Sequence, residues 1–298
     1  MPRKISGRMI AKTIKERLKA ETSAMLRKPG LAAVLVGNDP ASHLYVELKE
    51  KTCAEVGIRF EKHVLSEKTT THKLKTLIHA LNAKRDVDGI LIQLPLPRHL
   101  DEDEMIGAID PRKDADGFHP ANLKLLLEGK EPFARPVMLN AVEILLDSPE
   151  KNLRGKKAVV VGNSDLFCNT IKRLEQERGL SVRGLSAKQL TGRDKQKASS
   201  ITQKADVLIV AVGKPKLIEA SMVKNGVIII DIGTTRTDGG VEGDASSGAR
   251  NKSSWFTPVP GGVGPVTVAC LLENVVTLAQ HKQKTRRIVA PLLPNTSL

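Results

Sequence analysis

The stretch Asp88-Gly-Ile-Leu-Ile-Gln-Leu-Pro-Leu-Pro97 decides the fold of the first half of the chain. Its apolar run predicts a strand that is buried on both faces, as in a parallel sheet. Gln93 lies at the carboxyl end of this strand, and the prolines behind it make a rigid turn. Because open α/β sheets bind ligands at the carboxyl ends of their strands, Gln93 is expected either to contact a ligand or catalytic amine, or to anchor the loop.

Strands and helices alternate on both sides of that stretch, which predicts βαβ units and parallel sheets. The first half is expected to hold a helix capped by Ser6, a strand over 31–36, a helix over 41–55, a strand over 58–65 and a helix over 71–81. The second half follows a helix over 141–146 and a hinge near Pro149, with strands over 157–161, 180–184, 207–212 and 227–231, and helices over 170–178 and 265–280. The fold class is therefore α/β.

Composition narrows the class of protein. The 298 residues are 40% hydrophobic and 27% charged, which is typical of a globular chain with a real core. Only 2% are aromatic, which disfavours a binder of single-stranded nucleic acid that stacks bases. Three scattered cysteines, no apolar run near ~18 residues and no signal peptide favour a soluble, cytoplasmic protein without a metal site. The net charge of +14 fits anionic ligands, nucleic acid or a solvated basic surface.

Tyr45 and Lys49 lie four residues apart on an expected helix, so both project from one face. A lysine whose pKa is lowered by burial can transfer protons near neutral pH. The pattern alone is weak, because short-chain dehydrogenases share it and a surface lysine beside a packed tyrosine would give the same spacing. Tyr45 is, however, the only tyrosine in the chain.

The loop Lys113-Asp-Ala-Asp-Gly-Phe-His-Pro120 places Asp114 and Asp116 before a glycine. Two carboxylates alone make a poor cation site. Either carboxylate could instead accept paired N–H groups from a heterocyclic base, or form an Asx turn that caps the next helix.

A nucleotide phosphate would be sought at Gly162-Asn163-Ser164, directly after a strand. The loop has one glycine where a dinucleotide fingerprint has three, and Cys168 replaces one of them. The next strand ends in Arg183-Gly-Leu-Ser-Ala-Lys188, without an acidic residue for a ribose hydroxyl. The basic residues there weakly favour a 2′-phosphorylated nucleotide.

The segment Thr257-Pro-Val-Pro-Gly-Gly-Val-Gly-Pro-Val-Thr267 holds three prolines and three glycines at the start of a helix. Rigid corners and exposed backbone amides suit a flat ligand or an anion. A purely structural loop would rarely need so many constraints.

Taken in order, these motifs resemble the methylenetetrahydrofolate dehydrogenase/methenyltetrahydrofolate cyclohydrolase family. The resemblance runs from about residue 5 to 280 and rests on several specific segments: 37–49, 88–97, 113–120, 205–215, 231–233, 243–244 and 257–267. It implies a two-domain α/β subunit with folate in the cleft between the domains. The folate domain would span 1–139, completed by the helix 266–280; a Rossmann-like domain would span 140–265, followed by an exposed or disordered tail over 281–298.

The resemblance also implies the chemistry. The enzyme would oxidise 5,10-methylenetetrahydrofolate with NADP⁺ and hydrolyse the product to 10-formyltetrahydrofolate, as a cytoplasmic homodimer that serves purine biosynthesis. The expected catalytic residues are Lys49, Gln93 and Tyr45, with Tyr45 packing on the folate ring. The other expected contacts to folate are Asp116, Gly262, Val263, Gly264 and Pro265. The expected cofactor contacts are Gly162, Asn163, Ser164, Val212, Gly213, Gly233 and Thr234.

Departures from the family pattern concentrate in the cofactor half, at positions 136–141, 166–170, 184–187 and 231–236. Two interpretations stay open. Either hydrolysis is retained while NADP⁺ binding and oxidation are weakened or lost, or backbone groups bind the cofactor and both activities remain. A nucleic-acid-binding module and a non-catalytic scaffold are the rival classes, although the folate residues are intact; no nucleic-acid or membrane partner is expected.

Overall fold

The computed structural model describes residues 1–289, with the side chains of 165–167, 174 and 283–289 left undescribed. The chain divides into two compact units. The first, here called the Lys49 unit, comprises 13–137 and the chain from Val268 onward. The second, the Gly162 unit, comprises Met1–Lys12 and Met138–Thr267.

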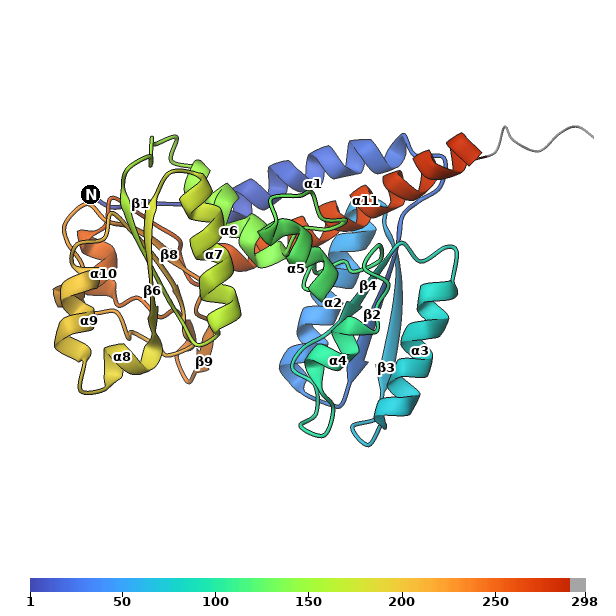
Figure 1. The fold of residues 1–298 in the computed structure, drawn as a ribbon, viewed down its shortest axis with the longest axis horizontal. Coiled ribbons are helices and arrows are strands. Elements are labelled where there is room, and N and C mark those ends of the chain that lie inside the picture. The colour runs from blue at the N-terminus through green and yellow to red at the C-terminus, as the bar shows by residue number, and fades with distance from the viewer. Residues whose placement is uncertain (290–298) are drawn as a thin grey trace, which may run out of the picture. The chain divides into compact units, whose positions relative to one another are not determined.

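The Lys49 unit is built on a three-stranded parallel sheet. Its strands run in the order β3 (Arg59–Leu65), β2 (Gly30–Val36) and β4 (Gly89–Ile92). Every residue of β2 is buried, which explains the continuous apolar run in the sequence. The helices of this unit are α2 (Pro40–Val56), α3 (Thr71–Ala83), α4 (Glu102–Gly107), α5 (Pro120–Leu127) and most of both α1 (Gly7–Ser23) and α11 (Val263–Val289). Helices α2 and α3 lie on opposite faces of the sheet (Figure 1).

A short polar segment adjoins β4. The Ile90 amide donates to the Lys113 carbonyl at 2.6 Å, and the Ala115 amide donates to the Ile90 carbonyl at 3.1 Å. The segment therefore runs parallel to β4, and its residues emerge at the same end of the sheet as those that follow β4.

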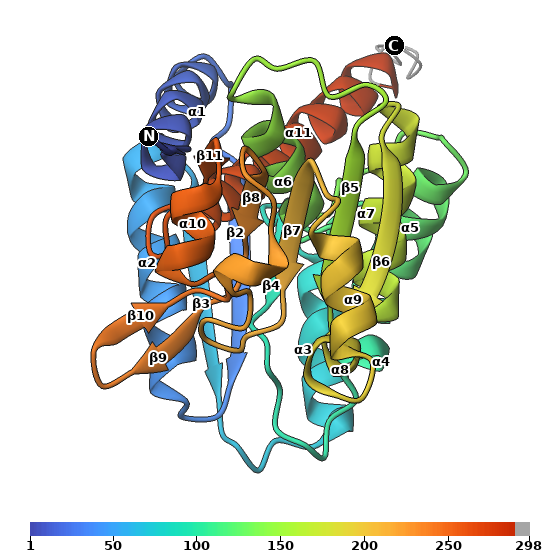
Figure 2. The same ribbon diagram turned by 90° about the vertical axis from the view of Figure 1, so that its left-hand side faces the viewer.

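The Gly162 unit holds a six-stranded sheet in which every pairing is parallel. The order is β6 (Ser181–Ser186), β5 (Lys157–Gly162), β7 (Val207–Ala211), β8 (Ile228–Asp231), β11 (Trp255–Phe256) and β1 (Arg3–Lys4). Figure 2 shows β6, β5, β7 and β8 in this order. Strand β6, which follows β5 in the chain, lies on one side of β5, and the next strand, β7, lies on the other side. The strand order therefore reverses at β5. In open α/β sheets such a switch point is where ligands bind.

Other elements of the Gly162 unit connect or cover these strands. They are α6 (Val137–Asp147), α7 (Asp165–Glu177), α8 (Ala187–Thr191), α9 (Lys195–Thr202), a 3-10 turn (Ala220–Met222), the hairpin β9 (Thr235–Thr237) and β10 (Gly240–Glu242), and α10 (Ser247–Lys252). An aliphatic cluster that includes Val161, Leu208 and Ile229 forms the core on one side of the sheet.

The structure confirms the expected α/β class and the main strands, but corrects several details. Residues 1–12 cluster with the second half of the chain, because Arg3 pairs with Trp255 and its guanidinium lies 5.3 Å from the ring centroid. Residues 281–289 of the expected tail are helical rather than disordered, since α11 continues through them, and His281 is exposed; residues 290–298 lie outside the described part. Helix α7 begins five residues earlier than expected, at Asp165.

Helix α11 is long and apolar enough over Val263–Lys282 to cross a membrane by length and composition alone. Most of this segment is buried inside the structure, as in the core helix of a globular protein. A polar anchor inside it supports the same interpretation: Asn274 donates to the carbonyls of Ala115 and Arg135, both at 2.8 Å.

Gly117 is required by the backbone of the loop that follows the Lys113–Ala115 segment. Its φ is +78°, and a Cβ there would lie 2.4 Å from the Arg135 carbonyl. We expect Gly117→Ala to lower the free energy of unfolding by at least about 3 kcal/mol, because conformational strain and a backbone clash add.

Gly129→Ala is the matched control for this prediction. Gly129 has a similar φ of +71° but open space around it, so only the strain of about 1–2 kcal/mol is expected. Urea denaturation of both variants measures the difference. Equal losses would show that the Arg135 backbone moves aside freely.

Candidate active site

Tyr45 and Lys49 occupy successive turns of α2, a helix whose ends are well defined. Asp39 caps its start by accepting the Ser42 amide at 2.8 Å, and Gly57 ends it in the left-handed conformation. Tyr45 is half exposed and Lys49 is partly buried. The helix therefore presents a phenol and an amine from one face, as the spacing predicted.

Gln93 meets Lys49 across the gap between α2 and the end of β4. The Lys49 Nζ donates to the Gln93 Oε1 at 2.8 Å. The Gln93 Nε2 donates to the Leu94 carbonyl at 2.7 Å, and its backbone amide donates to the Val34 carbonyl at 2.8 Å. The amide of Gln93 thus has its oxygen held toward the amine, so this residue both anchors its loop and positions Lys49.

Burial shifts the titration of this cluster. It lowers the pKa of Lys49, against the opposing effects of Asp116 and Cys53. It raises the pKa of Asp116 to about 6, partly offset by Lys49. It also raises the pKa of the Cys53 thiol, one turn beyond Lys49, to about 12, so this thiol is neutral at physiological pH. The amine and the Asp116 carboxyl are therefore the groups that can exchange protons near neutral pH.

The two aspartates of the 113–120 loop have different roles. Asp114 accepts hydrogen bonds from the Gly117 amide at 3.0 Å, the His119 amide at 2.7 Å and the Asn122 Nδ2 at 3.0 Å. Asp114 therefore holds the loop itself, and the prediction of an Asx turn that caps the next helix is wrong, because the His119 side chain caps α5 by accepting the Ala121 amide at 3.0 Å. Within residues 1–289, the Asp116 carboxylate accepts no hydrogen bond, which leaves it available to a ligand. No group of three metal-ligating side chains occurs among the described residues.

Sequence reasoning gave no role to Asn122 or Asn274, which hold this loop. Asn274 supports it from α11, and the Val137 amide donates to the Asp116 carbonyl at 3.0 Å. A buried asparagine within an otherwise apolar helix is the signal that could have identified Asn274.

In the Gly162 unit, the expected cofactor residues gather at the switch point of the sheet. Gly162 ends β5 and is buried, while Asn163 and Ser164 are exposed beyond it. The Asn163 Nδ2 donates to the Val212 carbonyl at 2.8 Å, which ties the loops after β5 and β7 together.

Asp244, to which the sequence assigned no role, organises the loop after β7. Its carboxylate accepts the amides of Val212 at 2.6 Å, Gly213 at 3.1 Å and Lys214 at 2.7 Å. These amides are therefore satisfied within the protein, and the loop's conformation depends on Asp244. A Cβ on Gly233 would lie 2.2 Å from the Asp244 carboxyl carbon, so Gly233 is required for packing, whereas the neighbouring Thr234 is exposed.

Asp231 holds Asp244 in turn. It accepts the amides of Gly233 at 3.1 Å, Asp244 at 3.0 Å and Ala245 at 2.9 Å. Burial raises the pKa of Asp231 to about 6, although these amides act to lower it.

The loop after β5 fits a dinucleotide despite its altered sequence. Cys168 is buried, and its Cβ lies 4.0 Å from where a Cβ on Gly184 of β6 would be, so it packs behind the loop against the sheet. Exposed Asn163 and Ser164 precede the first turn of α7, and the N-terminus of a helix favours an anion. At the end of β6, Arg183 and Lys188 are exposed, which suits a 2′-phosphate.

In the glycine-rich segment at the start of α11, one glycine is required for close packing and another is exposed to solvent. Gly262 packs against Gly7 and Thr257, where a Cβ would clash with the Thr257 side chain at 2.7 Å. Gly264 is exposed with open space around it, and Val263 and Pro265 open the helix α11.

Comparison with known proteins identifies the family. Residues 5–116 match the catalytic domain of tetrahydrofolate dehydrogenase/cyclohydrolase, and residues 136–283 match the NAD(P)-binding domain of the same family. The chain belongs to this family. The resemblance seen in the sequence motifs is thereby confirmed, and the departing positions 136–141, 166–170 and 184–187 lie inside the matched NAD(P)-binding domain.

Similar proteins match over nearly their whole length. The bifunctional protein FolD of Nautilia profundicola is 41% identical over 285 residues, covering 94% of this chain and 98% of the relative. That of Halothermothrix orenii is 43% identical, covering 93% and 98%. The bifunctional FolD structure from Campylobacter jejuni has a TM-score of 0.88 at 38% identity, covering 95% of this chain and 100% of that one. The Trypanosoma brucei FolD, solved with NADP and an inhibitor, has a TM-score of 0.87 at 31% identity, covering 96% and 100%.

Because the pKa of Asp116 is raised in the folded protein, the free energy of unfolding should depend on whether this carboxyl is ionised. The carboxyl ionises near pH 4 in the unfolded chain but near 6 in the folded one, so its stabilising effect is present below about pH 4 and is lost as the pH rises through 6. We expect Asp116→Asn to raise the free energy of unfolding by about 2 kcal/mol near pH 8, and by little near pH 4.

Urea denaturation at the two pH values checks this expectation. Glu131→Gln, an exposed carboxyl in the same unit, is the control and should change neither value by much. A variant of Asp116 that is less stable near pH 8 would contradict the electrostatic argument.

Proposed function

We propose that this chain is a bifunctional enzyme that oxidises 5,10-methylenetetrahydrofolate to 5,10-methenyltetrahydrofolate with NADP⁺ and hydrolyses the product to 10-formyltetrahydrofolate. The observation that carries the proposal is the Lys49–Gln93 hydrogen bond beside an available Asp116 carboxylate, within a chain that matches both domains of the family.

Lys49 is the central catalytic group of the proposal. The methenyl carbon is electrophilic, so attack by water needs a group nearby that manages the water's protons. Burial lowers the pKa of Lys49, which increases the neutral fraction of the amine, and the hydrogen bond to Gln93 fixes where that amine lies. Lys49 can then accept a proton as water adds and return it to the departing nitrogen as the C–N bond breaks, while the water's other proton is released to solvent and its oxygen becomes the formyl carbonyl.

Tyr45 and Asp116 are assigned to substrate binding. The half-exposed Tyr45 ring, one turn before Lys49, offers a face on which the folate ring would pack. Asp116 would accept N–H groups from the pterin, and bonds of this kind to a charged acceptor are stronger than neutral ones. Gly262 to Pro265, with exposed Gly264, would contribute further contacts at the folate and nicotinamide end.

Gly162, Asn163 and Ser164 would hold the phosphates of NADP⁺ at the switch point. The Val212–Gly213 loop and the Gly233–Thr234 corner would border them. When bound, NADP⁺ supplies the acceptor for the hydride that leaves the methylene carbon. The packing of Cys168 against Gly184 removes the main objection to binding there, and this supports two activities over hydrolysis alone.

The net charge and the family resemblance also bear on the substrate's tail and on the cellular setting of the enzyme. The basic surface charge suits the polyglutamate tails of folates. A cytoplasmic homodimer that supplies formyl groups for purine biosynthesis follows from the family resemblance. Neither a nucleic-acid-binding module nor a scaffold is favoured by any feature of the described residues.

Lys49→Ala tests the proposed catalytic centre. We expect both methenyltetrahydrofolate hydrolysis and NADP⁺-dependent oxidation to fall by at least about a hundredfold, because proton transfer by a positioned group contributes that much. Both rates should be measured spectrophotometrically on one purified sample.

Lys51→Ala is the control, since Lys51 is an exposed lysine of the same helix and should leave both rates near the wild-type values. Full hydrolysis in Lys49→Ala would refute the assignment. Wild-type protein that hydrolyses but does not oxidise, with either NADP⁺ or NAD⁺, would refute the dehydrogenase half.

Asp244→Asn tests the cofactor half separately. An amide has one acceptor oxygen where the carboxylate has two, so the Val212–Lys214 loop loses part of its support. We expect the KM for NADP⁺ to rise about tenfold or more, with methenyltetrahydrofolate hydrolysis little changed. Asp206→Asn, at a surface ion pair with Lys224 in the same unit, is the control. An unchanged KM would contradict the role given to Asp244.

A further inference from the structure

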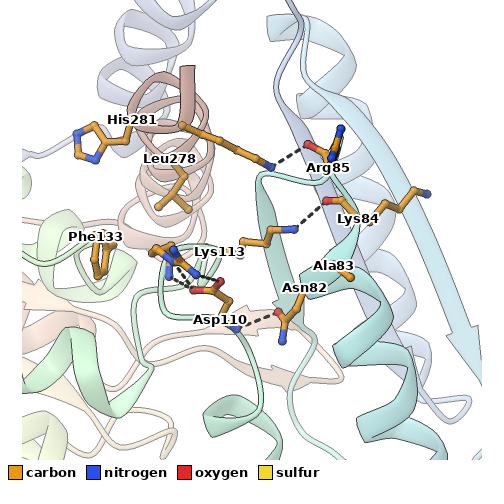
Figure 3. Close-up of a pocket in the computed structure, with 11 residues that line it drawn as sticks. Asn82, Ala83, Lys84, Arg85, Asp110, Lys113, Phe133, Leu278 and His281 are labelled. Carbon is orange, nitrogen blue, oxygen red and sulfur yellow. Dashed lines mark hydrogen bonds and ion pairs between the residues drawn. The ribbon is translucent and has the colours of Figure 1, made fainter. Parts of the chain in front are cut away.

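A second pocket lies in the Lys49 unit, at the opposite end of β4 from Gln93. Its cavity volume is about 580 Å³, within the range of small-molecule sites. The pocket is lined by the end of α3, the 110–113 turn, Phe133 and α11, as Figure 3 shows. The lining residues are Asn82, Ala83, Lys84, Arg85, Asp110, Arg112, Lys113, Phe133, Leu278, His281 and Lys282.

Positive charge dominates this lining, which holds five lysines and arginines and a single aspartate, although the Lys84 ammonium pairs with Glu61 outside the pocket at 2.7 Å. Arg112 pairs with that aspartate through two bonds, from Nε at 3.0 Å and from Nη2 at 2.8 Å, yet the arginine side chain remains 70% exposed. Its guanidinium can therefore contact a ligand without leaving Asp110.

Two of the lysines are held mainly by carbonyl oxygens. The Lys113 Nζ donates to the carbonyls of Leu81 at 2.9 Å and Lys84 at 2.8 Å. The Lys282 Nζ donates to the Arg85 carbonyl at 2.8 Å, and its nearest carboxylate oxygen, on Asp88, is 3.5 Å away. Asp88 is itself bound by Arg27 through bonds of 2.9 and 2.7 Å, so its charge is already compensated.

These cations repel one another. Burial is the main cause that lowers the pKa of Lys113 to about 8, and repulsion from Lys282 is the second. The carboxylates of Asp110, Asp88 and Asp86 act to raise it. An anion placed between the two amines would remove that repulsion. The pocket therefore favours a ligand that carries negative charge.

The other side of the pocket is apolar. Phe133 is 39% exposed and Leu278 stands beside it, on the side away from Lys84 and Arg85 (Figure 3). The chain has only five phenylalanines, and an exposed ring in a cavity next to a guanidinium provides a surface on which a flat ring can stack.

We propose that this pocket binds a phosphorylated ligand with a flat aromatic group, of the size of a mononucleotide. Its phosphate would lie between Lys113, Lys282 and Arg112, and its ring would lie against Phe133. The site is separate from the catalytic centre, because its residues 82–85 precede β4 and its residues 110–113 lead into the 113–115 segment, whereas Gln93 follows β4 and Asp116 follows that segment.

Calorimetric titration with AMP tests the proposal. The full chain is first saturated with NADP⁺, so that the nucleotide site of the Gly162 unit is filled. We expect AMP still to bind at one site per chain, and inorganic phosphate or adenosine alone to bind at least about tenfold more weakly. Loss of AMP binding under saturating NADP⁺ would overturn the proposal, as would phosphate that binds as tightly as AMP.

Variants locate the site. Arg112→Gln, Lys282→Gln and Phe133→Ala should each weaken AMP binding by about tenfold, since each removes a charged or stacking contact. Lys73→Gln, an exposed lysine on α3 outside the pocket, is the matched control and should bind as the wild type. Methenyltetrahydrofolate hydrolysis should be unchanged in all four, which separates this test from that of the catalytic centre. Wild-type AMP affinity in all three pocket variants would refute the assignment.

Discussion

The hydrogen bond between Lys49 and Gln93 is the contact on which the candidate site depends. It joins α2 to the end of β4. Because α2 follows β2 in the chain, the pairing of β2 with β4 brings Lys49 and Gln93 within reach of each other. The Gln93 amide donates to Val34, so the ladder fixes the backbone of Gln93. On the other side, the Asp39 cap fixes where α2 begins and therefore which turn carries Lys49. The chemistry thus rests on strand register and helix capping rather than on a flexible loop.

Burial lowers the pKa of Lys49 and raises that of Asp116, and desolvation is the main cause of both shifts. Desolvation disfavours the charged form of each group, so the amine becomes a weaker base and the carboxyl a weaker acid. The two values move toward neutrality, where proton transfer is useful. The same desolvation opposes folding at neutral pH, which is the usual relation between a poised site and stability.

The sequence predicted the buried strands well because apolar runs report burial directly. The position of Gln93 at a strand end left its partner open, and the family resemblance implied that it acts with Lys49. It could not predict how Asp114 and Asp116 divide their roles, since that depends on which carboxylate faces the backbone of Gly117 and His119. The β1–β11 pairing was missed because its partners are some 250 residues apart. The hairpin of β9 and β10 was missed because its strands are short and polar.

The cofactor half shows why side-chain motifs can change while a nucleotide site persists. The Asp244 carboxylate fixes the loop after β7 by accepting three backbone amides of that loop. The Asp231 carboxylate in turn fixes Asp244 by accepting its backbone amide. None of these bonds involves positions 166–170 or 184–187, where the chain departs from the family pattern. Within the departing segment 231–236 the bonds use Asp231, which the family pattern retains. The altered Cys168 is buried, with its Cβ 4.0 Å from where a Cβ on Gly184 would lie, an ordinary contact distance. The geometry of the switch point therefore survives the loss of a glycine fingerprint, since the carboxylates and the sheet maintain it.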